Sequence, residues 1–300
     1  MKIIFTFPGQ GAQRSGMLQQ LPDEETLREA RDVLGDELAT LDTPQALRHT
    51  RAVQLALLIA GVASARALMA QGVMPDMVSG LSIGAYPAAV MAGALDFRDA
   101  LTLVALRGDL MEQAYPEGYG LTAIIGLRLD QVEKLTAAHG AFIANLNAET
   151  QIVIAGRDDQ MAAVGEAALA LGATKVNRLA VSVPSHCALL DEPARKLAQA
   201  FSNVTLRRPQ RAYLSGSSAR VLWQPARIAD DLAFNMARTV RWQEAMIAAR
   251  ERDARLAIEM PPGGVLTCLT RQAGWEGESI SLERSGMAVA THLAARLPRD

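Results

Sequence analysis

A serine flanked by glycines is the residue in this sequence best suited to covalent chemistry. Ser82 stands in Gly80-Leu81-Ser82-Ile83-Gly84, after a short apolar run and before an alanine-rich segment. A strand that turns sharply into a helix needs small residues around an exposed serine. The next backbone N–H, that of Ile83, can then stabilise a tetrahedral oxyanion. The same letters also occur in ordinary glycine-rich turns, so the strand-then-helix context is what favours a nucleophile.

A serine hydroxyl is a weak nucleophile unless a base activates it. The chain has four histidines, at 49, 139, 186 and 292. We take His186 as the candidate base because it lies where an inserted middle segment should return the chain to its core, although a lone histidine is often structural. The four positions show no ligand spacing, so we expect no metal site.

Two further side chains could handle a substrate. Gln10 follows the first apolar segment in Pro8-Gly9-Gln10-Gly11, where backbone N–H groups could reach a substrate oxygen, or where the chain could simply make a tight turn. Arg107 lies among apolar residues of a predicted helix. A buried arginine is costly unless it is paired, so it should bind either a substrate carboxylate or an internal acid.

Strands alternating with helices should position these residues. This order predicts an α/β fold with a mostly parallel sheet covered on both faces. The middle of the chain follows the order β-α-β-β-α-β, which is typical of a ferredoxin-like unit. We therefore predict a discontinuous core of residues 1–119 and 185–300 with a small domain, 120–184, inserted. The other main predictions are a strand over 2–7, a long apolar helix over 50–70 and helical structure from 228 to 252.

Composition narrows the functional classes. The chain has 300 residues, of which 50% are hydrophobic, so a large core can form. The net charge of −2 gives no global reason to expect nucleic-acid binding. We read Cys187 and Cys268 as reduced thiols of a cytoplasmic protein. The apolar stretch 52–65 is too short to span a bilayer, and the first residues do not form a signal peptide, so we expect no membrane association.

Taken together, these segments resemble the malonyl-coenzyme A:acyl carrier protein transacylase family, and the match runs over nearly the whole chain. The segments that carry the resemblance are FPGQGAQ at 7–13, GLSIGAY at 80–86, LRGDLM at 106–111, QIVIAG at 151–156, VSVPSHCALL at 181–190 and PPGGVLT at 261–267.

The resemblance implies a fold and a set of roles. The fold would be an α/β-hydrolase-like core with a ferredoxin-like insert. Ser82 would be acylated, His186 would be its base, and Arg107 would bind the malonyl carboxylate. The amides of Gln10 and Ile83 would form the oxyanion hole. Malonyl-CoA would be a substrate with no permanently bound cofactor, and the partner would be an acyl carrier protein.

This chain departs from the usual family pattern at the elbow and near the histidine. Leu81 and Ala85 replace a histidine and a glutamate, and Asn235 stands where a glutamine carbonyl usually orients the catalytic histidine. Together with Ala-Asn-Leu-Asn-Ala at 144–148, these changes resemble the malonyltransferase (epsilon) subunit of biotin-independent malonate decarboxylase. The expected acceptor is then the carrier subunit of that system. The alternatives are the transacylase of fatty acid synthesis, a thioester hydrolase of the same fold, and a non-catalytic carrier-docking subunit.

Overall fold

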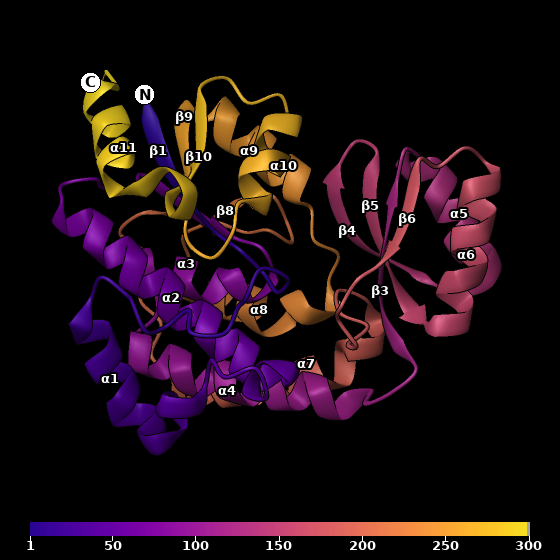
Figure 1. The fold of residues 1–300 in the computed structure, drawn as a ribbon, viewed down its shortest axis with the longest axis horizontal. Helices are drawn as coiled ribbons and strands as arrows, with labels where there is room; N and C mark the ends of the chain where they lie inside the picture. Colours follow the sequence, from indigo (N-terminus) through magenta and orange to yellow (C-terminus); the bar gives the residue numbers. More distant parts are fainter. Residues whose placement is uncertain (299–300) are drawn as a thin grey trace.

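The computed structural model describes residues 1–298 and shows two unequal lobes, each built on its own sheet (Figure 1). The larger lobe holds a six-stranded sheet in the order β10-β9-β1-β2-β7-β8. The smaller lobe holds a four-stranded sheet in the order β4-β5-β3-β6. The first and last elements, β1 and α11, both belong to the larger lobe, so the smaller lobe is formed by the middle of the chain (Figure 1).

The large sheet is almost entirely parallel. β1 pairs in parallel with β2 and β9, β10 with β9, and β2 with β7, whereas β7 and β8 are antiparallel. Phe7 at the end of β1 is level with Gly80 at the end of β2, so two loops leave the sheet side by side, at the edge where ligands of α/β folds bind. The strands are β1 (Lys2–Phe7), β2 (Met77–Gly80), β7 (Ala212–Leu214), β8 (Val221–Leu222), β9 (Ala254–Glu259) and β10 (Glu278–Ser281).

Helices cover this sheet, which is why its central strands carry continuous apolar runs. The residues Ile3, Ile4, Phe5 and Phe7 of β1 are all fully buried. The helices of the larger lobe are α1 (Glu24–Leu34), α2 (Thr50–Ala70), α3 (Ala85–Met91), α4 (Phe97–Ala114), α7 (Asp191–Ala200), α8 (Pro225–Phe234), α9 (Trp242–Glu251), α10 (Val265–Gln272) and α11 (Leu282–Arg296).

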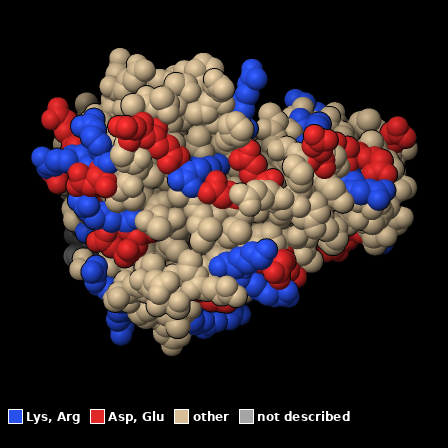
Figure 2. Space-filling view, turned by 90° about the horizontal axis from the view of Figure 1, so that it is seen from below, with Lys and Arg blue, Asp and Glu red and all other residues tan. Residues whose placement is uncertain are grey.

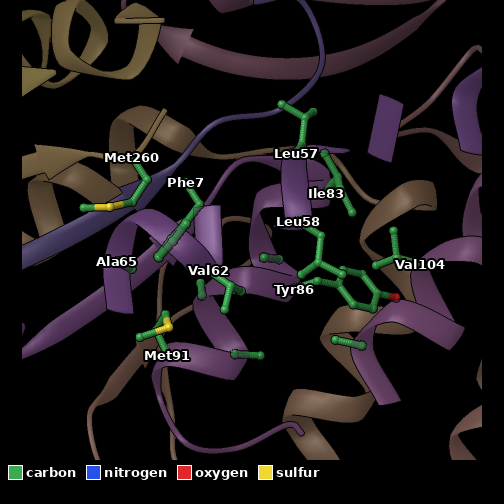
Figure 3. Packing of buried hydrophobic residues seen from close by; sticks show 14 of the residues in the cluster. Phe7, Leu57, Leu58, Val62, Ala65, Ile83, Tyr86, Met91, Val104 and Met260 are labelled. Carbon is green, nitrogen blue, oxygen red and sulfur yellow. The ribbon is translucent and has the colours of Figure 1, made fainter. Parts of the chain in front are cut away.

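The helix α2 is the centre of the apolar core. Figure 3 shows its side chains beside Phe7 of β1, Tyr86 of α3 and Val104 of α4. Its length and composition alone would allow it to cross a membrane, but 83% of its most apolar window is buried inside the fold. We therefore assign α2 as a core helix. It is longer than the apolar stretch 52–65 on which the sequence argument rested.

The smaller lobe has the predicted order of elements, and its sheet is antiparallel throughout. Its elements are β3 (Tyr119–Ile125), α5 (Leu129–His139), β4 (Phe142–Ala148), β5 (Gln151–Arg157), α6 (Asp158–Ala170) and β6 (Lys175–Arg178). β4 also contacts the larger lobe, because Val240 donates its N–H to Ala144 and accepts from the N–H of Leu146. This bridge holds one edge of the smaller sheet against the segment that precedes α9.

The predicted fold class is confirmed as an α/β fold with a parallel-rich sheet and a second, antiparallel sheet. The division at 119/120 and 184/185 stays a prediction. The continuous helical structure expected over 228–252 is wrong: α8 ends at Phe234, a 3-10 turn η6 (Asn235–Ala237) follows, and α9 begins only at Trp242. The bridge of Val240 to β4 occupies the gap between them. The short strands β7 and β8 were not predicted.

Charges of both signs are mixed over the surface that Figure 2 shows, with no gathering of one sign on that face. This distribution agrees with the near-zero net charge. It offers no broad positive field of the kind that attracts a nucleic-acid backbone.

Candidate active site

The turn that presents Ser82 is shaped by two glycines. Ser82 follows β2 after one residue and has a φ of 57°, which is uncommon for a residue with a side chain. A Cβ added at Gly80 would lie 1.9 Å from the carbonyl carbon of Gly84, and one added at Gly84 would lie 2.1 Å from the carbonyl oxygen of Phe7. The elbow therefore needs glycine at both places. A 3-10 turn, η3 (Ser82–Gly84), rather than a regular helix, leads into α3.

The hydroxyl of Ser82 is held by an arginine. Its Oγ lies 3.2 Å from Nη2 of Arg107, which donates a hydrogen bond to it. Within residues 1–298 no hydrogen bond joins Ser82 to His186, although both residues line one cavity of about 270 Å³. That cavity lies between the lobes, since Gln10 lines it from the larger lobe and Asn145 from the smaller one. Ser82 and His186 thus line the same cleft, and there the serine hydroxyl is bonded to the guanidinium of Arg107 and not to the imidazole.

The imidazole of His186 is oriented by a backbone carbonyl. Its Nδ1 lies 2.8 Å from the carbonyl oxygen of Asn235. A carbonyl only accepts, so Nδ1 carries the proton and Nε2 is left as the basic nitrogen. The backbone is anchored as well: His186 has a φ of 67° and donates its N–H to the carbonyl of Met236 at 2.6 Å.

Burial sets the charge state of this histidine. It lowers the pKa of His186 to about 4, and the neighbouring Arg107 charge lowers it too, while the carbonyls of Asn235 and Arg238 act in the opposite direction. His186 is therefore neutral at neutral pH. A neutral imidazole with a free Nε2 can accept a proton from a hydroxyl.

The end of α8 is what makes the Asn235 carbonyl available. Inside a helix this oxygen would accept from the N–H four residues later and be enclosed by the next turn. Here the helix ends at Phe234, and among the backbone N–H groups of the described chain only that of Arg238 donates to the Asn235 oxygen, over a long 3.3 Å. The sequence predicted this carbonyl contact through the resemblance. It did not predict that the Asn235 side chain also forms hydrogen bonds in the site. This side chain accepts from Arg107 at 3.0 Å and donates to the Ser82 carbonyl at 3.3 Å.

Arg107 is fully buried and has no carboxylate partner among the described residues. Its Nη1 donates to Oε1 of Gln54 at 2.7 Å, and its Nη2 donates to Ser82 and Asn235. Its Nε has no partner within the described chain. The guanidinium carbon lies 5.9 Å from the centre of the Tyr86 ring. The internal salt bridge considered as the alternative for Arg107 is therefore not formed.

Burial lowers the pKa of Arg107 to about 10, so the side chain remains charged at neutral pH. A buried cation surrounded only by neutral dipoles is poorly compensated. Such a cation favours a small anion at close range, and Arg107 adjoins the cavity through Ser82, which lines it. A carboxylate is the anion that fits arginine best, because its two oxygens match two parallel N–H donors.

Gln54 is a site residue to which the sequence assigned no role. It is fully buried on α2, where it accepts from Arg107 and donates to the side-chain oxygen of Gln10 at 3.4 Å and to the sulfur of Met111 at 3.4 Å. The available signal was a lone amide within an otherwise apolar helix. A buried amide needs partners, so its presence indicates a polar cluster nearby.

The loop that carries Gln10 lies directly against the elbow. A Cβ at Gly9 would lie 2.8 Å from Cδ2 of Leu81 and 3.1 Å from its carbonyl oxygen. This close approach puts Gln10 on the same cavity as Ser82. Ile83 is buried immediately behind the serine. The structure thus brings together all the site residues predicted from the sequence.

The smaller lobe contributes two amides to the cavity. Asn145 and Asn147, both on β4, are 6% and 8% exposed and line the cavity. The side-chain oxygen of each is buried with no hydrogen-bond partner in the described part of the chain. Unpaired buried acceptors are rare and call for an explanation such as a ligand. A ligand with N–H groups would satisfy them.

One carboxylate, that of Glu259, also lines the cavity, but it is already occupied. Its oxygens accept from the N–H groups of Leu266 and Thr267 and from the Thr267 hydroxyl, so it caps the start of α10. Burial raises its pKa. Across residues 1–298 no group of three or more histidine, cysteine, aspartate or glutamate side chains could hold a metal ion.

Known proteins match this chain over almost its full length. Residues 4–295 match the family model of the acyl transferase domain. The malonyl CoA-acyl carrier protein transacylase of Escherichia coli (strain K12) is 37% identical over 307 residues, covering 97% of this chain and 99% of that protein.

Solved structures match equally well. The acyl-carrier-protein S-malonyltransferase of Burkholderia pseudomallei is 35% identical with a TM-score of 0.90, covering 98% of this chain and 100% of that one. A malonyl-transacylase solved in complex with its type II PKS acyl-carrier protein is 34% identical with a TM-score of 0.92, covering 97% of this chain and 99% of that one.

The elbow geometry predicts that Gly84→Ala is strongly destabilising. Gly84 has an ordinary helical φ of −57°, so the loss would come from the clash with the Phe7 carbonyl alone. We expect a loss of about 3 kcal/mol or more, as for other overpacked sites. Urea denaturation measures it. Gly172→Ala is the control, because that glycine has open space around it and its φ of 97° adds only backbone strain. Equal losses in the two variants would contradict the prediction.

The burial of His186 predicts a pH dependence of stability. Its folded-state pKa of about 4 lies below the ordinary value of 6.5, so between these values the unfolded chain binds more protons at this site. The free energy of unfolding should therefore rise with pH through this window and level off above it. Relative to His186→Gln, which lacks this contribution, the wild type should gain up to about 3 kcal/mol. Denaturation curves at a series of pH values measure the difference, and a pH-independent difference would refute it.

Proposed function

The chain belongs to the malonyl-CoA:acyl carrier protein transacylase family of acyltransferases, and on that premise we propose that it moves a malonyl group from coenzyme A to an acyl carrier protein thiol through an ester on Ser82. One observation carries the proposal. A buried, charged Arg107 without a carboxylate partner lies one hydrogen bond from the hydroxyl of Ser82, and Ser82 lines a cleft together with the neutral imidazole of His186. This combination suits an acyl group with an acid at its far end.

In the first half-reaction, Nε2 of His186 takes the proton of Ser82 as its Oγ attacks the thioester carbonyl. The backbone amides of Gln10 and Ile83 stabilise the oxyanion. The carbon–sulfur bond then breaks, and coenzyme A leaves with the proton from His186. The carbonyl of Asn235 keeps Nδ1 protonated throughout, so a backbone oxygen does the work of the acid in a triad.

In the second half-reaction the carrier thiol attacks the ester by the reverse route. Its proton passes to His186 and then to Oγ of Ser82, which is thereby restored. Two transfers through one covalent intermediate give ping-pong kinetics. Because malonyl-CoA would bring its thioester and the carrier its thiol to the same cleft, a single set of residues serves both steps.

The side-chain oxygens of Asn145 and Asn147, which have no hydrogen-bond partner in the described chain, could bind coenzyme A and the carrier protein's prosthetic arm. Coenzyme A and a holo carrier protein both end in an extended arm with amide N–H groups. Each buried side-chain oxygen can accept one of them. These asparagines would then hold the arm along β4 while the thioester lies at Ser82.

The acceptor could be a general acyl carrier protein or the carrier subunit of a malonate decarboxylase. The relatives above support a general malonyl-CoA:acyl carrier protein transacylase, the alternative in the sequence argument, and do not single out the malonate decarboxylase subunit. The narrower hypothesis of a dedicated decarboxylase carrier rests on Leu81 and Ala85, on the segment Ala-Asn-Leu-Asn-Ala at 144–148, and on Asn235. Cys187 and Cys268 are both free, in keeping with a reducing compartment, and we propose the cytoplasm.

A covalent intermediate is the first expected result. Incubation with malonyl-CoA and no carrier should add one malonyl group to the wild type, and digestion should locate it on Ser82. Ser82→Ala should show no such gain and no transfer. Rapid release of free malonate in place of a stable adduct would instead indicate a hydrolase. Full activity of Ser82→Ala in an assembled system would indicate a docking subunit.

Arg107→Ala should separate malonyl from acetyl transfer. Loss of a buried charge partner typically costs about 2–5 kcal/mol, so kcat/KM for malonyl-CoA should fall by roughly 30-fold to several thousand-fold. Acetyl transfer should be retained. Steady-state transfer to a holo carrier measures both. Arg66→Ala is the control, since Arg66 lies on α2 and pairs with Glu29 outside the cavity. Unchanged malonyl transfer by Arg107→Ala would rule out the carboxylate contact.

The two kinds of carrier can be compared directly. With malonyl-CoA fixed, transfer is measured to the holo acyl carrier protein of fatty acid synthesis and to the holo carrier subunit of a malonate decarboxylase. We expect a higher kcat/KM with the holo acyl carrier protein of fatty acid synthesis, because the relatives are named as malonyl CoA-acyl carrier protein transacylases. A large preference for the decarboxylase carrier would establish the narrower hypothesis instead.

A further inference from the structure

The hydrogen bonds of Arg107 are unevenly distributed. Nη1 is held by Gln54, while Nη2 is shared between Ser82 and Asn235. Nε has no partner, although it is buried. In an arginine the N–H groups of Nε and Nη2 lie along one edge of the guanidinium plane, and this edge is one that carboxylates bind side-on. The edge that is incompletely used therefore includes Nη2, the nitrogen that binds Ser82 and Asn235.

We propose that Arg107 is a gate on Ser82 that the carboxylate of the cargo opens. The inference rests on the proposed function. An acyl group with a terminal carboxylate takes the Nε–Nη2 edge, satisfies the orphan Nε and displaces Oγ of Ser82 from Nη2. The released hydroxyl is then free to donate to Nε2 of His186. Arg107 thus selects the cargo twice, once by binding it and once by releasing the nucleophile.

The surrounding contacts support a displacement that leaves the arginine in place. Gln54 holds Nη1 on the opposite side of the guanidinium, and Asn235 accepts from Nη2 while donating to the backbone carbonyl of Ser82. Both contacts can persist when the hydroxyl leaves. Only the Ser82 side chain has to turn, by a rotation about one bond. Such rotamer changes are among the fastest side-chain motions.

Electrostatics acts in the same direction. In this structure the Ser82 hydroxyl accepts from Arg107 and forms no hydrogen bond with His186 among the described residues, so its proton is not directed at the base. The Arg107 charge also lowers the pKa of His186, in addition to the effect of burial. A carboxylate on Arg107 offsets that charge, so the base becomes stronger when the correct cargo is bound. An acyl group without a carboxylate makes neither change.

The gate can be tested by supplying the cargo in two pieces. Acetyl-CoA provides the thioester, and formate provides the carboxylate. The step followed is acetylation of Ser82: the carbon–oxygen ester bond forms, the carbon–sulfur bond breaks, and the serine proton leaves with coenzyme A through His186. Intact-mass spectrometry gives the rate in the wild type over a series of sodium formate concentrations, with sodium chloride at equal ionic strength and with formamide, which has the size of formate but no charge.

The gate predicts that formate accelerates acetylation saturably, by about tenfold, the size expected for freeing a hydrogen bond to a charged group. Formamide and chloride should have no such effect. Arg107→Ala should be acetylated at the faster rate without formate and should not respond to it. Arg66→Ala should behave as the wild type does.

Acetylation that formate leaves unchanged, together with an Arg107→Ala rate no higher than that of the wild type, would overturn the gate. If the variant does not fold, an unchanged wild-type rate across the formate series overturns it alone. Malonyl-CoA labelling of Ser82 in the same preparation separates the two proposals. Labelling by malonyl-CoA without any formate effect removes the gate and leaves the transferase function intact, whereas no labelling at all removes the function.

Discussion

The site is arranged around an arginine charge that is buried without a carboxylate partner. Taking a guanidinium out of water is costly, and the neutral groups of Gln54, Asn235 and Ser82 recover only part of that cost. An internal aspartate or glutamate would compensate the charge better, but it would also occupy the position that an anionic ligand needs. The fold instead retains an uncompensated cation next to a nucleophile. The free energy lost by burying Arg107 without a carboxylate is partly recovered when an anion binds there, which strengthens that binding.

The three partners of Arg107 come from distant parts of the chain, and each is positioned by a different structural device. Gln54 is carried by α2, which is buried because nearly all its other residues are apolar. Ser82 is carried by the elbow after β2, where glycines allow the chain to pass the end of β1. Asn235 follows the end of α8, and its carbonyl and side chain serve His186 and Arg107 respectively. A shift of any one element would therefore disturb Arg107, and a shift at the end of α8 would disturb His186 as well.

Both residues proposed to react have a strained backbone. Ser82 and His186 are two of the four non-glycine residues with positive φ within the described chain, and such conformations cost about 1–3 kcal/mol each. They persist because their surroundings hold them. The parallel pairing of β1 with β2 fixes the elbow, and the N–H of His186 is bonded to Met236. The smaller lobe completes the cleft through β4, which the bridge at Val240 attaches to the larger lobe.

Hydrophobic pattern and turn chemistry were enough to predict much of the fold. The strand over 2–7 and the helix over 50–70 have the predicted bounds, because a buried strand and a buried helix each need a continuous apolar run of the matching length. The prediction of a continuous helix over 228–252 was wrong because of a contact between the two lobes. Residues between Asn235 and Trp242 have no proline or glycine, yet Val240 pairs with β4 of the other lobe and the helix is interrupted there.

By itself the sequence determined which residues could react and the need for glycine at position 80, because the clash of a Cβ there with the backbone of Gly84 is local and follows from residue type. Only the tertiary structure decided that Arg107 has neutral partners instead of an acid, that Gln54 joins the site, and that the serine hydroxyl binds the cation while the imidazole binds a backbone carbonyl. These are contacts between residues tens of positions apart. They depend on how sheets and helices pack, which no local pattern specifies.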